Sequence, residues 1–158
     1  MRSLLIVFIL VSSTNLVNAQ QWSIESTIGI SYSGINHTVR GSFQKNQLQV
    51  AIGPKANYSK SNLPWSRIPG VSLLVGYDIL ASTKVKSQGM LLYEVLPLNN
   101  AVIQEVYLGY RMQYLLKQKW KIQNSVGFGG YSETANNTIN YSINGLSYCV
   151  NFGLSYRL

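Results

Sequence analysis

The chain of 158 residues carries 13 Lys and Arg against five Asp and Glu, a formal net charge of +8, yet charged residues make up only 11% of it. A water-soluble domain contains about 25% charged residues, so this composition disfavours a globular protein with a fully hydrated surface. The basic residues are dispersed and form no helix or cluster, which argues against a nucleic-acid partner. The one cysteine, Cys149, has no partner for an internal disulfide.

The amino-terminal segment has the pattern of a secretory signal peptide. A positive start at Arg2 is followed by an apolar run from Leu4 to Val11 and by a polar stretch that ends in Ala19. The apolar run is too short to cross a bilayer as a helix, which needs about 20 residues. We therefore expect residues 1–19 to be a cleaved signal peptide and residues 20–158 to form one exported domain.

The remaining sequence predicts strands, because large apolar residues alternate with small or polar ones at a period of two. In the first strand Ile24 and Ile28 fall on one face, and Glu25 and Thr27 fall on the other. In chain order, strands are expected at residues 22–32, 35–43, 48–58, 71–79, 88–96, 102–114, 120–129 and 148–158. Proline has no N–H to donate to a sheet, so Pro54 predicts a bulge or a local break in the third strand.

The connections between these strands are of two kinds. Those at 44–47, 80–87 and 115–119 are fairly short, and those at 59–70 and 130–145 are longer and contain many Ser and Asn residues. Short turns on one side and long loops on the other are typical of bacterial outer-membrane barrels. The sequence therefore predicts an all-β fold, an eight-stranded antiparallel up-and-down transmembrane β-barrel after a cleaved signal peptide.

Charged residues of the expected strands share the face that carries small and polar side chains. They are Glu25, Arg40, Lys55, Asp78, Glu94, Glu105, Arg111, Lys121 and Arg157. An Arg or Lys that faces the middle of a bilayer costs about 2 to 4 kcal/mol, so we place this face in the lumen. Eight strands leave room only for side chains, which predicts a filled barrel rather than a pore. One ionic cluster is expected to hold Glu25 between Arg40 and Arg157.

Aromatic residues of the opposite face fall near the strand ends and predict two rings at the membrane surfaces, where Trp and Tyr are enriched. The periplasmic ring would contain Trp22, Phe43, Tyr77, Tyr114, Trp120 and Tyr156. The outer ring would contain Tyr32, Tyr58, Tyr93 and Tyr148.

The last strand carries the sharpest pattern. Its large residues at alternate positions are Tyr148, Val150, Phe152, Leu154, Tyr156 and Leu158. With this pattern the chain resembles the small eight-stranded outer-membrane barrels of the OmpA/OmpX type, including the short barrel proteins of Bacteroidetes-like bacteria. Members of that group more often end in Phe, so Leu158 departs from them.

That resemblance implies a place in the bacterial outer membrane, in contact with its lipid and lipopolysaccharide. It also implies that the barrel-assembly machinery recognises the terminal pattern. The role implied is structural, or adhesion and partner binding through surface loops, and the fold does not choose among these. Loop residues that could contact an envelope protein, a surface partner or lipopolysaccharide phosphates are Trp65, Arg67, Tyr131 and Tyr141. Solvated loops without a specific partner are the alternative.

Two other function classes remain as alternatives. A soluble exported barrel of the lipocalin kind would bind a small apolar ligand and would have the opposite facing, with apolar rows inside and charges in water. An outer-membrane lipid-modifying enzyme would need a His, a Ser and an acid, but the one histidine, His37, has serines and no acid near it in sequence. We therefore predict no catalytic residues, no metal site and no cofactor.

Overall fold

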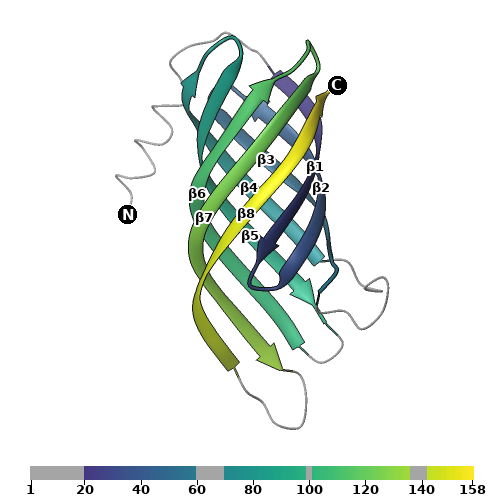
Figure 1. The fold of residues 1–158 in the computed structure, drawn as a ribbon, viewed down its shortest axis with the longest axis vertical. Helices are drawn as coiled ribbons and strands as arrows, with labels where there is room; N and C mark the ends of the chain where they lie inside the picture. Colours follow the sequence, from purple (N-terminus) through teal and green to yellow (C-terminus); the bar gives the residue numbers. More distant parts are fainter. Residues whose placement is uncertain (1–19, 60–69, 99–100, 136–141) are drawn as a thin grey trace, which may run out of the picture.

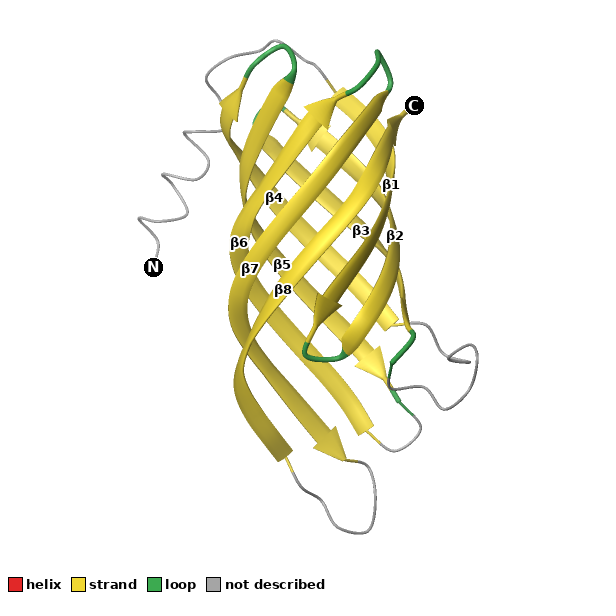
Figure 2. Cartoon of the chain, viewed as in Figure 1, coloured by secondary structure: helices red, strands yellow, loops and turns green. Residues whose placement is uncertain are grey.

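A computed structural model describes residues 20–59, 70–98, 101–135 and 142–158, and the expected signal peptide lies outside these ranges. The chain forms eight strands: β1 (Gln20–Ser31), β2 (Gly34–Lys45), β3 (Leu48–Asn57), β4 (Gly70–Ala81), β5 (Val85–Pro97), β6 (Ala101–Leu115), β7 (Trp120–Ala135) and β8 (Ser142–Arg157). Each strand pairs antiparallel with the next and β8 pairs with β1, so the sheet closes into the barrel expected from the sequence (Figures 1 and 2).

The period of two sets which side chains face out of the barrel. Leu108 and Phe152 are 68% and 62% exposed on the outer wall, whereas Glu25 and Thr27 are buried in the lumen. Closing the sheet gives every strand two neighbours, which satisfies backbone groups that lipid cannot hydrogen-bond. In the described ranges we find no helix of the length and apolarity needed to cross a bilayer.

The two ends of the barrel differ. One end, the turn end, carries the short β2–β3, β4–β5 and β6–β7 turns, the start of β1 and the end of β8, and it is uppermost in Figure 1. The opposite end, the loop end, carries the β1–β2, β3–β4, β5–β6 and β7–β8 connections. In barrels of this kind the short turns face the periplasm.

The β7–β8 hairpin is longer than the sequence predicted. Much of the expected loop at 130–145 is strand, because β7 and β8 pair as far as Thr134 and Ser142, while β1 follows β8 only to the pair of Ile30 with Val150. The hairpin consequently extends past β1 and β2 at the loop end (Figure 1). Its outer part carries polar residues on both faces, and such a strand lacks the apolar alternation by which the others are recognised.

Pro54 interrupts the pairing of β2 with β3, as expected. Residues on either side pair in one register, Thr38 with Lys55 and Gly41 with Ile52, but the positions between them are unpaired. The interruption is therefore a local break without an extra residue. A shift of register does occur elsewhere, between Asp78 and Leu80 in the pairing of β4 with β5, and the sequence did not predict it.

Candidate functional site

Eight charged side chains of the lumen form ion pairs with one another among the described residues. The four acidic and four basic side chains are Glu25, Arg40, Lys55, Asp78, Lys86, Glu94, Glu105 and Arg111. All are buried except Lys86, which is half-buried. Lys86 was not among the predicted lumen residues. Because each charge has an opposite partner, the interior avoids the cost of an isolated buried ion.

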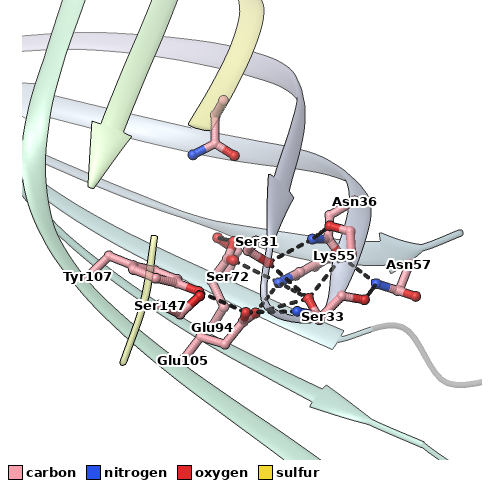
Figure 3. A network of polar contacts seen from close by, with 12 residues as sticks. Ser31, Ser33, Asn36, Lys55, Asn57, Ser72, Glu94, Glu105, Tyr107 and Ser147 are labelled. Atoms are coloured by element: carbon pink, nitrogen blue, oxygen red, sulfur yellow. Dashed lines mark hydrogen bonds and ion pairs between the residues drawn. The ribbon is translucent and has the colours of Figure 1, made fainter. Parts of the chain in front are cut away.

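One cluster is centred on Lys55, towards the loop end (Figure 3). Its ammonium Nζ lies 2.7 Å from Oε2 of Glu94 and 2.7 Å from Oε2 of Glu105. The β1–β2 turn completes the cluster, because the backbone N–H and the hydroxyl of Ser33 donate to the two oxygens of Glu105 at 3.1 and 3.0 Å. Gly34, with a φ of 100°, takes the left-handed conformation that this turn needs. The hydrogen bonds of Ser33 therefore connect the β1–β2 turn at the loop end to β6.

A second cluster surrounds Glu25, nearer the turn end. Oε2 of Glu25 lies 2.8 Å from Nη2 of Arg111 and 3.8 Å from Nε of Arg40. The expectation that Arg157 flanks Glu25 is wrong. Arg157 pairs with Ser23 at the last step of the β1–β8 ladder and is exposed at the turn end, so its guanidinium remains hydrated while β6 supplies the counter-ion. Lys121, also predicted for the lumen, is half-buried near the same rim.

Uncharged polar residues connect the ionic clusters. The amide of Gln49 donates to Glu25 at 2.7 Å, and the amide of Gln88 donates to Gln49 at 2.9 Å and to Asp78 at 2.7 Å. Ser72 accepts from Arg40 and donates to Glu94, which joins the two clusters. These three residues were not among the predicted site residues, although their positions on the inward face of their strands were a signal that could have identified them.

Part of the interior is apolar. A buried cluster spans β3 to β6 and β8 and consists of Ala51, Leu74, Met90, Leu92, Tyr107 and Cys149. The alternation in the sequence places Ala51, Leu74, Tyr107 and Cys149 on the inward face, but the predicted lumen network contained only charged residues. The cluster's side chains lie on the inward face of their strands, as the charged ones do. Apolar side chains as well as ion pairs fill the interior of an eight-stranded barrel.

Most of the predicted aromatic positions lie on the outer wall. Trp22, Tyr58, Tyr77, Tyr93, Tyr114 and Trp120 are exposed there, and Phe43 is half-exposed against Trp22. Tyr32 is an exception. Its ring stacks on Tyr131 with centroids 3.4 Å apart, and its hydroxyl donates to Glu133 at 2.8 Å, so it packs against the extended hairpin instead of facing lipid.

The remaining predicted residues fall in two groups. Tyr148, Val150, Phe152, Leu154, Tyr156 and Leu158 follow one another along the outer face of β8 and its end. Of the candidate loop contacts, Tyr131 lies in β7, and Trp65, Arg67 and Tyr141 lie outside the described residues.

His37 and Ser26 form a polar pair on the outer wall, where the His37 Nε2 and the Ser26 Oγ are 2.9 Å apart. Among the described residues, no hydrogen bond or ion pair joins His37 to a carboxylate. In the same ranges no three His, Cys, Asp or Glu side chains are grouped so as to hold a metal ion.

Comparison with known proteins supports the fold. No family model matches the chain, and no curated protein matches it. Among solved structures it is similar to the N-terminal β-barrel domain of Pseudomonas aeruginosa OprF, with a TM-score of 0.60, 9% identity, and coverage of 87% of this chain and 97% of that one. It is also similar to a de novo designed transmembrane β-barrel, with a TM-score of 0.56 and 11% identity over 87% of this chain and 95% of the design.

The orientation of the side chains decides between a membrane barrel and a soluble one. Lipid-compatible residues such as Ile28 and Leu108 are exposed on the outer wall, and ionic residues such as Glu25 and Lys55 are buried inside. The lipocalin-like alternative requires the reverse and is therefore wrong. The chain has the fold of the small outer-membrane β-barrels, and its apolar outer wall agrees with the expected place in the bacterial outer membrane.

Proposed function

We propose that this protein is a non-catalytic barrel that anchors an interaction surface at the loop end, where it binds a surface or envelope protein. The observation that carries the proposal is the β7–β8 hairpin, which extends past β1 and β2 (Figure 1). Its outer part exposes an apolar side chain on each face of β8, Leu146 on the outward face to 77% and Ile143 on the opposite face to 46%. We expect a partner protein to contact these side chains, because they are exposed on a hairpin that projects past the neighbouring strands.

The filled lumen supports anchoring rather than transport. Glu25, Lys55 and Arg111 have almost no exposed surface, and they hold partners from opposite sides of the barrel. A diffusion path would have to break several of these ion pairs at once, and each would leave a buried charge without a partner. This arrangement favours a rigid support over a channel.

The polar pair of Ser26 and His37 does not favour an enzyme. A serine nucleophile needs a base that a third group orients and needs donors for the oxyanion. Both residues lie on paired strands, whose backbone N–H groups point along the sheet rather than towards a bound carbonyl. We therefore propose no catalytic role for His37.

Photo-crosslinking in intact cells tests the proposal. A photo-reactive residue at Leu146 should give a discrete adduct with one partner protein, whereas the same residue at Leu116, which is exposed at the turn end, should not. The double variant I143S/L146S should lose binding of that partner while keeping the heat-modifiable gel mobility of a folded barrel. Absence of an adduct at Leu146, or unchanged binding by the double variant, would contradict it.

A further inference from the structure

The excess positive charge of the described chain lies mainly at the turn end. Its exposed or half-exposed bases there are Lys45, Lys84, Lys117, Lys119, Lys121 and Arg157. None of these six forms an ion pair with a carboxylate in the described ranges, because Asp78 at this end holds Lys86. The turn end therefore presents an uncompensated positive surface beside the lipid-facing wall.

A depression in this surface combines the bases with aromatic rings. It lies at the β6–β7 turn and is lined by Lys117, Gln118, Lys119, Trp120 and Tyr156. The Lys119 Nζ lies 5.5 Å from the centroid of the Tyr156 ring, and the rings of Trp120 and Tyr156 are 4.9 Å apart. The ammonium group of Lys119 thus stands over one of two adjacent amphipathic rings, and Lys117 lines the same depression.

The backbone holds this depression in place. The N–H of Arg157 donates to the carbonyl of Lys119 at 2.8 Å, which ties the end of β8 to the β6–β7 turn. Within the turn, the N–H of Trp120 donates to the carbonyl of Lys117 at 3.2 Å. The lysines are therefore carried by a closed turn beside a paired strand, and little backbone order has to be gained on binding.

The wall beside the depression is apolar. In the β7–β8 register Trp120 is opposite Tyr156, and the next outward pair is Ile122 with Leu154. A ligand that matches this whole surface has three parts. An anionic head would contact the lysines, a region that is partly polar and partly apolar would contact the rings, and a hydrocarbon chain would contact Ile122 and Leu154. A soluble phosphate or a nucleic acid matches only the first part.

We propose that this depression binds the phosphate headgroup of an anionic phospholipid from the leaflet around the turn end. Lys117 and Lys119 contact the phosphate, and Trp120 and Tyr156 pack on the glycerol region, where aromatic residues favour the interface. The proposal rests on the membrane-barrel fold and does not depend on a protein partner at the loop end, so either can fail without the other.

Quenching of a single tryptophan tests the site. The W22F/W65F variant, in which Trp120 is the remaining tryptophan, is reconstituted into vesicles of phosphatidylcholine and phosphatidylglycerol. In each sample one of the two lipids is brominated near the glycerol. We expect brominated phosphatidylglycerol to quench Trp120 at least about fivefold more effectively per molecule, which is the preference that one lysine near an anionic surface gives. The preference should weaken in high salt.

The matched controls separate a site from general attraction. K117Q/K119Q should abolish the preference, while K45Q/K84Q, which removes the same charge from other turns, should retain most of it. Folding of each variant is checked by heat-modifiable gel mobility. Equal quenching by both lipids, equal losses in the two double variants, or displacement of the lipid by inorganic phosphate at matched ionic strength would overturn the proposal.

Discussion

The Lys55 ammonium lies 2.7 Å from a carboxylate oxygen of Glu105 at a depth where both side chains have almost no exposed surface. Glu94 shares the same ammonium at 2.7 Å. Three ions so close together are favourable only as a set, because each alone would be a buried charge without compensation. The three residues come from β3, β5 and β6, so the cluster joins opposite sides of the barrel.

Removing the cation should destabilise the barrel strongly. K55M leaves Glu94 and Glu105 buried beside each other, and breaking a buried pair in this way costs about 3 to 5 kcal/mol. Urea unfolding in lipid vesicles, followed by heat-modifiable mobility, measures the loss. The triple variant K55M/E94Q/E105Q removes the uncompensated charges and should recover much of the stability. Equal stability of K55M and the unmodified protein would contradict this account of the lumen.

The counter-ion of Glu25 can be identified by comparing two arginines. R111M removes the guanidinium that lies 2.8 Å from Glu25 and should cost about 3 to 5 kcal/mol of unfolding free energy. R157Q changes an exposed residue at the rim and should cost less than about 1 kcal/mol. A larger loss in R157Q than in R111M would restore the pairing expected from the sequence.

This comparison also shows how far the sequence predicts the site. Alternation identified the facing of Glu25, Arg40 and Arg111 correctly, because a period of two fixes the side of the wall on which each residue lies. It did not identify the partners, since these depend on the stagger between strands and on reach across the lumen. Arg111 comes from β6, far from Glu25 in sequence, and no local pattern connects them.

The fold was predictable for a related reason. Strands that contact lipid carry apolar residues at most alternate positions, so their faces and order could be derived from the sequence despite exceptions such as Ser26 and His37. The outer part of β7 and β8 carries polar residues at positions such as Ser132 and Asn144, which are paired with each other. Because apolar residues do not alternate with polar ones in this part of the hairpin, the sequence predicts a loop at residues 130–145.

The stack of Tyr32 on Tyr131 should support the extended hairpin. Y131A removes a ring contact worth about 0.5 to 1.5 kcal/mol and should increase proteolytic cleavage within residues 130–145, with the barrel below intact. Y131F keeps the ring and serves as the control. Cleavage rates equal to those of the unmodified protein in Y131A would show that the hairpin is held without this stack.

The same contact should depend on pH only in alkali. Burial, together with the neighbouring Glu133 carboxylate, raises the pKa of the Tyr32 phenol above its usual value. A raised pKa in the folded state means that the contact stabilises the protein below the ordinary tyrosine pKa, about 10, and is lost as pH rises further. Protease resistance of the hairpin should be constant from neutral pH to about 9 and fall beyond it, and Y32F should remove this alkaline transition.

The outer wall provides the most direct test of the membrane orientation. Leu108 lies near the middle of β6 and is 68% exposed there, so L108R would place a cation among acyl chains at a cost of about 2 to 4 kcal/mol. L116R places the same charge in the β6–β7 turn, where water and headgroups can solvate it, and should cost less than about 1 kcal/mol. Unfolding free energies measured in vesicles would compare the two. If Leu108 instead faced water, both variants would be tolerated alike, and the assignment of the apolar wall to lipid would be wrong.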